Sequence, residues 1–191
     1  MPNKQNHAFH ELDMVVAGYG ERGICSQVYW SDGTRDDVPV KVGTVVQHIA
    51  EAYGKTLQSI RRHWREMYRA AKEERFGKMA ILAISPGVLL MPVKLAVKMV
   101  GRDAAIGYVN LAQPVRFLEE KDGTGARSRI EFVNSPNVLD TVWTCRTLER
   151  HFVAARHFFL EEDQRYTHEK TIMEHANSYL WEWHHHPMYL H

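Results

Sequence analysis

The spacing of apolar residues changes twice along this chain, and that change limits the folds that it can form. Three short runs rich in valine, isoleucine and aromatic residues come first, at Leu12–Ala17, Ile24–Trp30 and Val38–Val42, with glycine-containing turns between them. Such runs predict β-hairpins. From Thr44 the apolar residues recur every three or four positions, as in a helix, and after Gly77 short β-like runs return. We therefore expect an α+β fold made mainly of short antiparallel strands.

Two helices are expected in the first helical stretch. Thr44 and Gln47 have the spacing of a capping box, and Gly54 is a typical C-terminal stop. The second helix begins at Thr56, and its apolar residues fall on one stripe: Leu57, Ile60, Trp64, Met67 and Ala71. Basic residues occupy the other side, so we expect a central cationic helix.

The β-pattern after Gly77 contains further runs, at Met79–Ile84, Val88–Met91, Ile106–Leu111, Val115–Leu118 and Arg129–Val133. Ser85-Pro86-Gly87 predicts a turn that joins the first two runs into a hairpin. Residues 93–102 carry Lys94, Lys98 and Arg102 at a spacing of four, which fits either a short helix or a basic loop.

The C-terminal part predicts a pair of helices. Ser135-Pro136 has the pattern of a helix start. It is followed by an apolar stripe at Val142, Cys145, Leu148, Phe152, Ala155 and Phe159. The near-heptad spacing of this stripe fits two arrangements, a dimer face and packing on the protein's own sheet. A last helix is expected at about Thr167–Trp183.

The 191 residues predict a single domain, with an N-terminal β part (1–43), helices (44–76), a second β part (77–134) and C-terminal helices (135–183). Its apolar stretches are far shorter than the roughly 20 residues of a membrane span. Met1–His10 lacks the apolar core of a secretory signal, and Cys25 and Cys145 form no disulfide framework. These features predict a cytoplasmic protein with no membrane-spanning segment, and we expect no membrane partner.

Positive charge is concentrated in the middle of the chain. Residues 55–102 contain eleven lysines and arginines and three glutamates, a local net charge of +8 in a chain whose total is +1. On a helical wheel, Arg61, Arg65, Arg69 and Lys72 fall within an arc of about 80° nearly opposite the apolar stripe. Cations aligned in this way neutralise phosphates and release condensed counterions. The pattern favours a polyanion as partner, and nucleic acid is the commonest one.

We expect ten basic residues to contact DNA phosphates or the minor groove: Arg61, Arg62, Arg65, Arg69, Lys72, Arg75, Lys78, Lys94, Lys98 and Arg102. Three other interpretations of the basic helix stay open. It can be a solvated face, a surface that docks onto an acidic partner protein, or a helix that lies on anionic lipid.

Catalytic and metal-binding motifs are missing from the sequence. It contains no HExxH, no closed Cys/His set, no Gly-rich phosphate loop and no GxSxG, and His184-His185-His186 has the pattern of a solvated tail. We therefore expect no metal, no cofactor and no enzymatic activity. The alternative is a nucleic-acid-processing enzyme that uses His63, His151 and His157 as general base or metal ligands.

Read in order, several short segments resemble the competence transcription factor family, ComK. They are Cys25-Ser26-Gln27-Val28, then Tyr53-Gly54 with Arg61-Arg62 shortly after, then Ser85-Pro86-Gly87-Val88-Leu89-Leu90-Met91-Pro92, and then Gly107-Tyr108-Val109. The family has, in the same order, a Cys-Ser strand, an aromatic-Gly pair before a basic segment, an apolar strand with a Phe-Pro-like end, and a later aromatic strand. The resemblance spans roughly residues 24–110, and the chain departs from it in having Ala105-Ile106 where the family tends to have Cys and His.

The resemblance implies a cytoplasmic DNA-binding activator that recognises paired AT-rich boxes through the minor groove. It also implies a homo-oligomer that switches on genes for DNA uptake, and a proteolytic adaptor protein as a partner. The resemblance rests on ordered residue identities, whereas the basic helix is identified from its electrostatics. Residue order and charge thus converge on DNA, and our leading hypothesis is a regulator that binds double-stranded DNA.

Overall fold

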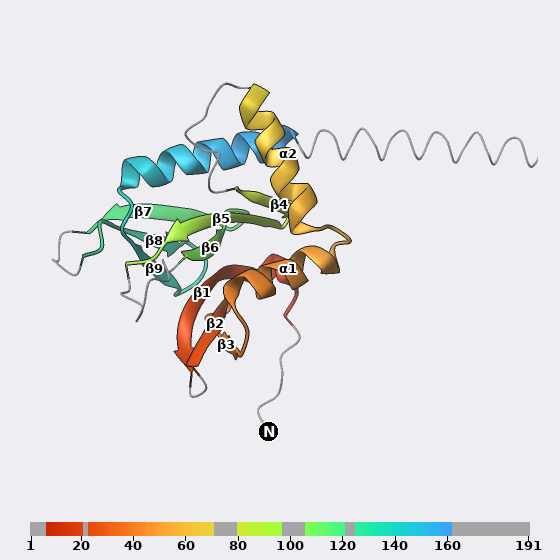
Figure 1. Cartoon of the computed structure of the whole chain (residues 1–191). Helices are drawn as coiled ribbons and strands as arrows, with labels where there is room; N and C mark the ends of the chain where they lie inside the picture. Colours follow the sequence, from red (N-terminus) through yellow and green to blue (C-terminus); the bar gives the residue numbers. More distant parts are fainter. Residues whose placement is uncertain (1–6, 21–22, 71–79, 97–105, 121–124, 162–191) are drawn as a thin grey trace, which may run out of the picture.

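The computed structural model describes residues 7–20, 23–70, 80–96, 106–120 and 125–161. Within these ranges the chain has an α+β fold, with a six-stranded antiparallel sheet, a three-stranded antiparallel sheet and three helices (Figure 1). The expected α+β class with mainly antiparallel strands is therefore confirmed.

The larger sheet has the strand order β3-β2-β1-β6-β5-β4. Its strands are β1 (Leu12–Gly20), β2 (Gly23–Trp30), β3 (Arg35–Val38), β4 (Leu82–Ser85), β5 (Val88–Lys94) and β6 (Ile106–Asn110). Val109 in β6 pairs with Met14 in β1 and with Met91 in β5. The strand β6 thereby joins the N-terminal β1–β3 ribbon and the β4–β5 hairpin into one sheet.

The smaller sheet contains β7 (Val115–Glu119), β8 (Ser128–Phe132) and β9 (Val138–Thr141) in that order. A bridge between Leu95 and Thr141 joins β9 to the end of β5. The chain then continues into a helix over residues 145–161. The second helix of the expected C-terminal pair, Thr167–Trp183, lies outside the described residues.

Alternating side chains of the larger sheet fill two cores. In β5, Leu89 and Met91 point to one face while Val88 and Leu90 point to the other, as the period of two requires. The first face packs against the smaller sheet and the 145–161 helix, and we call this the sheet–sheet core. The opposite face packs against α1 (Val42–Ala52), and we call this the α1 core.

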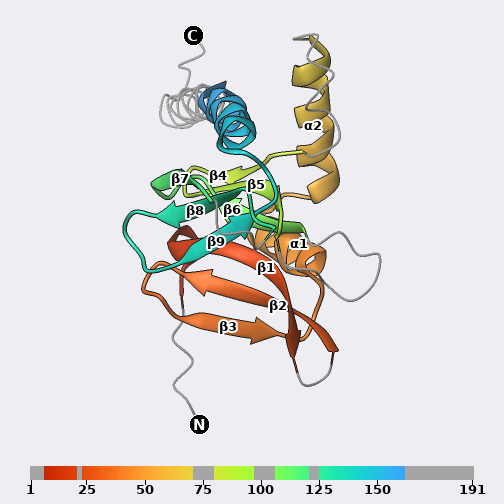
Figure 2. The same ribbon diagram turned by 90° about the vertical axis from the view of Figure 1, so that its left-hand side faces the viewer.

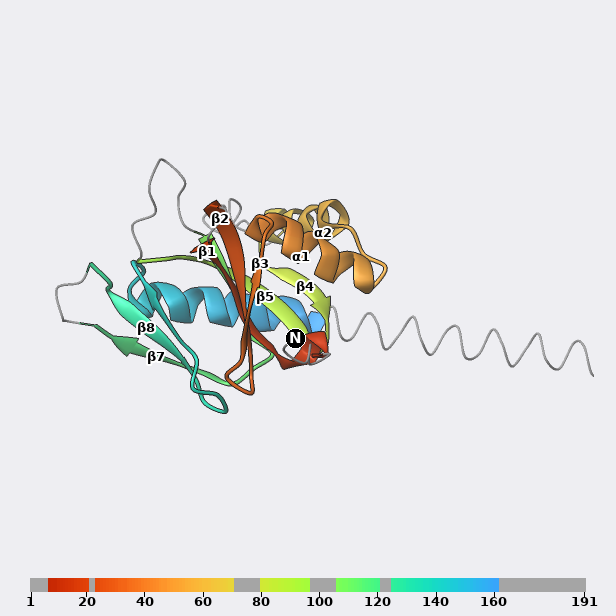
Figure 3. The same ribbon diagram turned by 90° about the horizontal axis from the view of Figure 1, so that it is seen from below.

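The helix α1 ends in a Schellman motif that leads the chain straight into α2 (Leu57–Ala70). Lys55 N donates to Ala50 O (3.0 Å) and Gly54 N donates to Glu51 O (2.9 Å), while Gly54 takes a φ of 68°. The stop expected at Gly54 is confirmed. Seen from below, α1 and α2 lie next to each other beside β4 (Figure 3).

Two predictions for the N-terminal half are wrong. The third strand is β3 and not Val38–Val42, because the turn after Trp30 is short: Trp30 N donates to Thr34 O (3.0 Å), so pairing resumes at Arg35. The first helix begins at Val42 rather than Thr44, since Val42 is itself buried in the α1 core, and Gln47 bonds to Glu51 (2.7 Å) instead of closing a capping box.

The predicted helix start at Ser135-Pro136 is also wrong. Leu139 pairs with Ile130, so residues 138–141 form β9, a strand that the sequence pattern did not reveal. The helix starts at residue 145, where the Thr144 hydroxyl accepts a hydrogen bond from Thr147 N (3.3 Å). Of the two arrangements considered for the apolar stripe of this helix, the structure has packing on the protein's own sheets, with Leu148 and Ala155 fully buried.

Asn110, at the end of β6, is buried, and its side chain satisfies four backbone groups. Its Oδ1 accepts hydrogen bonds from Leu89 N (2.9 Å) and Ala112 N (3.2 Å). Its Nδ2 donates to Leu12 O (2.9 Å) and Gly87 O (3.0 Å). One side chain therefore fastens β1, the β4–β5 turn and the loop after β6 at a point where strand pairing ends.

The strand β3 forms one edge of the larger sheet and is charged. Arg35, Asp36 and Asp37 are exposed, and Arg35 forms an ion pair with Asp37 (3.3 Å). Trp30 Nε1 donates to Asp36 Oδ2 (2.9 Å), which fixes this edge against β2. In the described ranges, no helix is long and apolar enough to cross a membrane.

Candidate nucleic-acid interface

The helix α2 is held firmly at its N-terminus. The Thr56 hydroxyl accepts a hydrogen bond from Ser59 N (3.1 Å), which makes Thr56 the N-cap of α2, one residue before the helix begins at Leu57. The preceding Lys55 extends its ammonium to the carbonyl oxygen of Ala83 in β4 (3.4 Å). These two contacts attach the start of α2 to the larger sheet.

The inner face of α2 is anchored in both cores. Ile60 is buried in the α1 core, and Trp64 is buried in the sheet–sheet core. The Trp64 ring meets Phe158 of the 145–161 helix, and His63 packs against the same phenyl ring at 5.6 Å. Figure 2 shows the two helices standing side by side above β4 and β5.

The outer face of α2 is basic and exposed. Arg61, Arg62 and Arg65 lie on it, and we call these three residues the arginine face. The Arg65 guanidinium donates to Arg61 O (3.1 Å), which aligns Arg65 along the helix. Arg62 forms a long ion pair with Glu66 (4.0 Å) in which both side chains stay more than half exposed. This pair is screened by solvent, so all three guanidinium groups stay available to an anion.

The other predicted contact residues do not extend the arginine face within the described structure. The backbone of Arg69 belongs to α2, but its side chain lies outside the described part. Five more residues lie outside the described ranges altogether: Lys72, Arg75, Lys78, Lys98 and Arg102. Their expected role in DNA binding stays a prediction.

Lys94 is exposed but lies elsewhere in the fold. The helix α2 contacts β4, which pairs with β5 only as far as Leu90. Lys94 comes four residues later, about 14 Å along the strand. Its carbonyl oxygen accepts a hydrogen bond from the Thr141 hydroxyl (2.6 Å), which places it beside the smaller sheet. The described residues therefore do not bring Lys94 to the arginine face.

The dimensions of α2 determine how the arginine face can meet a duplex. Its 14 residues span about 21 Å, and a helix with side chains is about 10–12 Å wide. That width fits the major groove, which is about 12 Å across, and exceeds the minor groove, which is about 6 Å. Contact with a minor groove therefore requires the arginine side chains to reach in from a helix that lies over the phosphates.

The three histidines considered for catalysis occupy separate environments. His63 packs against Phe158, and His157 forms an ion pair with Glu161 (3.3 Å) on the outside of its helix. His151 stacks on Trp143 with ring centroids 4.6 Å apart, and burial lowers the pKa of its imidazole. No group of three metal-ligating side chains occurs among the residues that the structure describes.

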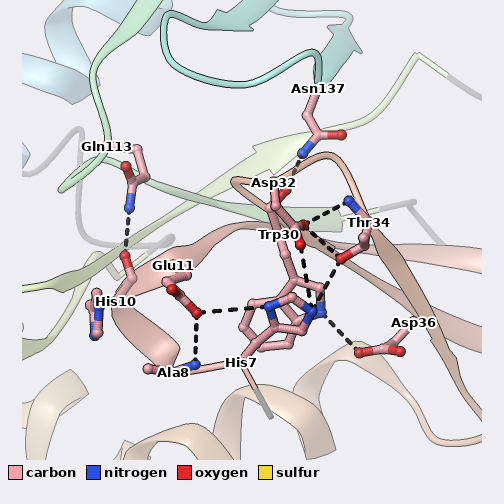
Figure 4. Close-up of polar contacts among 10 residues, drawn as sticks. All are labelled: His7, Ala8, His10, Glu11, Trp30, Asp32, Thr34, Asp36, Gln113 and Asn137. Atoms are coloured by element: carbon pink, nitrogen blue, oxygen red, sulfur yellow. Dashed lines mark hydrogen bonds and ion pairs between the residues drawn. The ribbon is translucent and has the colours of Figure 1, made fainter. Parts of the chain in front are cut away.

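A dense polar cluster surrounds Trp30 near the N-terminus (Figure 4). The His7 ring stacks on the indole, with centroids 4.6 Å apart and planes at 13°. Its two nitrogens lie 3.7 Å from Glu11 Oε2 and 4.0 Å from Asp32 Oδ2, and Nε2 is 3.1 Å from the Thr34 hydroxyl. These contacts fasten the start of the described chain to the β2–β3 turn, so the cluster has a clear structural role.

Behind this cluster, Asp13 connects the two sheets. It is the extra residue of a β-bulge in β1 and is only 1% exposed. Its carboxylate accepts hydrogen bonds from the Ser135 hydroxyl and from Asn137 Nδ2 (2.9 Å), and Asn137 Nδ2 also donates to Trp30 O (2.7 Å). Burial outweighs these hydrogen bonds and raises the pKa of Asp13 above its usual value.

No sequence pattern singled out His7, Asp13 or Asn137. A weak signal exists for Asp13, because an acid inside the apolar run Leu12–Ala17 breaks the alternation expected of a strand. Its partners lie more than 120 residues away along the chain, so no local pattern reveals them. Comparisons of the chain with models of protein families, with curated proteins and with solved structures give no match.

Proposed function

We propose that this protein is a transcriptional regulator that binds double-stranded DNA through α2. The observation that carries the proposal is the arginine face itself, with Arg61, Arg62 and Arg65 exposed on a helix whose opposite side is anchored in both cores. Because packing already fixes the backbone of α2, little backbone entropy is lost when its arginines contact phosphates. Most of the favourable electrostatic free energy of binding is therefore retained.

The resemblance to the ComK family supports a more specific role. Three of the segments that carry it lie on β2, on the β4–β5 hairpin and on β6, which belong to the larger sheet. They include packing positions: Cys25 is buried, and a Cβ at Gly107 would lie 2.9 Å from a Val16 methyl. The resemblance therefore concerns the sheet that supports α2, while the DNA contacts rest on the charge of α2.

On this basis the protein is an activator of competence and DNA-uptake genes that works in the cytoplasm. It binds paired AT-rich boxes as a homo-oligomer, with arginines reaching into narrow A-tract minor grooves. A proteolytic adaptor protein is the protein partner that the resemblance implies. Arg69, Lys72, Arg75, Lys78, Lys98 and Arg102 extend the footprint beyond the arginine face.

The test is equilibrium binding to two labelled duplexes, one with paired A-tract boxes and one rich in GC, followed by fluorescence anisotropy at two salt concentrations. We expect tighter binding to the A-tract duplex, with an affinity that falls steeply as salt rises. Equal affinities for the two duplexes would support DNA as the ligand but would contradict a preference for AT-rich sequence. An absence of binding to either duplex at low salt would exclude DNA as the ligand and would favour an acidic protein partner for the arginine face.

A further inference from the structure

A second surface of the molecule has the features of a small-molecule site. A groove of about 460 Å³ lies between the β4–β5 turn, the loop after β6, the start of β7 and the 145–161 helix. Leu89, Leu111, Val115, Phe152 and Phe159 are among the side chains that line it. Its volume lies within the range of small-ligand sites, and most of its lining side chains are apolar.

One charged side chain, Arg156, lies among the apolar residues that line the groove. Arg156 lines the groove from the 145–161 helix and is exposed. Within the described part of the chain it forms no ion pair with any carboxylate. The other polar side chain of the lining is Gln113, whose Nε2 already donates to His10 O (2.5 Å). As far as the described residues define it, the groove therefore presents a single unpaired guanidinium beside an apolar surface.

We propose that this groove binds a small amphipathic monocarboxylate, such as a medium-chain fatty acid. The carboxylate pairs with the Arg156 guanidinium, which is a bidentate donor for that group. The alkyl chain covers Phe152, Phe159 and the aliphatic walls, where each buried methylene is stabilising. Nothing in this proposal depends on DNA binding.

The lining disfavours two other kinds of occupant. A peptide brings backbone N–H and C=O groups that need hydrogen-bond partners when buried, and the lining offers few side chains that can supply them. A simple inorganic anion would use Arg156 alone and leave the apolar walls in water. A ligand with one charged end and one apolar end uses both features.

The experiment is isothermal titration calorimetry on the purified full chain without DNA, with each carboxylate below its micelle concentration and the alcohol below its solubility limit. The probes are hexanoate, octanoate, decanoate and decanol. We expect each added methylene to tighten binding by about fourfold, which corresponds to about 0.8 kcal/mol. Decanol, which has the same chain without the charge, should bind at least about tenfold more weakly than decanoate.

Two variants and one control locate the site. R156Q should weaken decanoate binding by at least about tenfold and leave decanol binding unchanged. A112W places an indole in the groove and should weaken both ligands. R146Q removes an exposed arginine near the start of the same helix, outside the groove lining, and should bind decanoate like the parent protein. Circular dichroism checks that each variant is folded.

Three results would overturn the proposal. Equal affinities for decanoate and decanol would show that the carboxylate charge does not contribute to binding. An equal loss of decanoate affinity in R156Q and R146Q would show that the ligand does not bind at Arg156. No binding of decanoate at millimolar concentration would exclude a monocarboxylate as the ligand of the groove. Because no DNA is present, none of these results bears on the proposed regulator function.

Discussion

The phenyl ring of Phe158 meets the indole of Trp64 edge-on, with ring centroids 5.0 Å apart and ring planes at 87°. Both side chains are almost fully buried, with exposed fractions of 1% and 0%. Aromatic pairs in this geometry are stabilising beyond the area that they bury. Since Trp64 lies opposite the arginine face, this contact is one of those that hold the helix carrying that face.

We expect Phe158→Ala to lower the free energy of unfolding by about 3–5 kcal/mol, because it leaves a cavity against Trp64. Phe158→Leu refills part of that space and should cost less. Urea denaturation measures both changes. Val153→Ala is the control on the same helix, since Val153 is 66% exposed, and should change the free energy by less than about 0.5 kcal/mol. Equal effects of Phe158→Ala and Val153→Ala would show that the contact does not anchor α2.

The double variant R61A/R65A should weaken DNA binding for all sequences, because it removes two cations that neutralise phosphates. It should also flatten the plot of log affinity against log salt by about 0.9 for each phosphate that is no longer neutralised. The matched control is R116A/R146A, which removes the same charge from two arginines outside α2. Anisotropy titrations at four salt concentrations give both slopes. A slope that changes equally in the two double variants would assign the effect to net charge.

Asn110→Asp should be strongly destabilising, by about 3 kcal/mol or more. An ionised carboxylate cannot donate to Leu12 O and Gly87 O, and it is repelled by both carbonyls. A protonated carboxyl group can donate one hydrogen bond, so part of the loss should be recovered in acid. Asn134→Asp, at an exposed position, makes the same chemical change and should have little effect. Urea denaturation of both variants at pH 4 and pH 7 tests this expectation.

Asp13 should make stability depend on pH in the direction opposite to an ordinary ion-paired acid. Because burial raises its pKa in the folded protein, the folded state holds the proton at pH values where the unfolded chain has lost it. Stability therefore falls as pH rises from about 3.9, the unfolded pKa of an aspartate, through the higher folded value.

The variant Asp13→Asn cannot titrate, and its carboxamide oxygen can accept the hydrogen bonds from Ser135 and Asn137. The stability of Asp13→Asn relative to the parent should therefore increase with pH across this window and then level off. Urea denaturation from pH 3.5 to pH 8 gives the difference curve, and Asp37→Asn at the exposed sheet edge corrects for the change in net charge. A flat or falling difference curve would contradict the expectation.

Substitution by alanine should change the free energy of unfolding in opposite directions at two glycines, one at each end of α1. Gly43 lies in the first turn, where an added methyl group would meet open space, so Gly43→Ala should stabilise the protein by up to about 1 kcal/mol. Gly54 also has open space around it but takes a φ of 68°, so Gly54→Ala should cost about 1 kcal/mol through the backbone alone. Thermal unfolding of the pair measures the contrast.

The sequence predicted the elements whose signals are local. The hairpin β1–β2, the Pro-Gly turn between β4 and β5, the stop at Gly54 and the amphipathic stripe of α2 all follow from neighbouring residues. The wrong predictions concern elements whose bounds are set by contacts between residues that lie far apart in the sequence. Val42 joins α1 because it is buried under it, and Ser135-Pro136 precedes a strand because Leu139 pairs with Ile130.

Only part of the candidate interface could be predicted, because local sequence signals place some of its residues and not others. Helical periodicity places Arg61 and Arg65 on the face opposite Trp64, so the exposed arginines could be found from sequence. The position of Lys94 could not, because it depends on how far β4 runs along β5. The groove beside Arg156 was also invisible, since its walls come from segments separated by up to about seventy residues.

The charged edge strand β3 limits how this protein associates with itself. An open sheet edge is a template onto which a strand of another molecule can add, and a six-stranded sheet has two such edges. In an in-register parallel pairing, Asp36 and Asp37 on β3 would face the same carboxylates of an identical strand, and the repulsion disfavours this mode of growth at that edge. The charge of β3 thereby disfavours the addition of further strands, and with it fibril growth, at this side of the sheet.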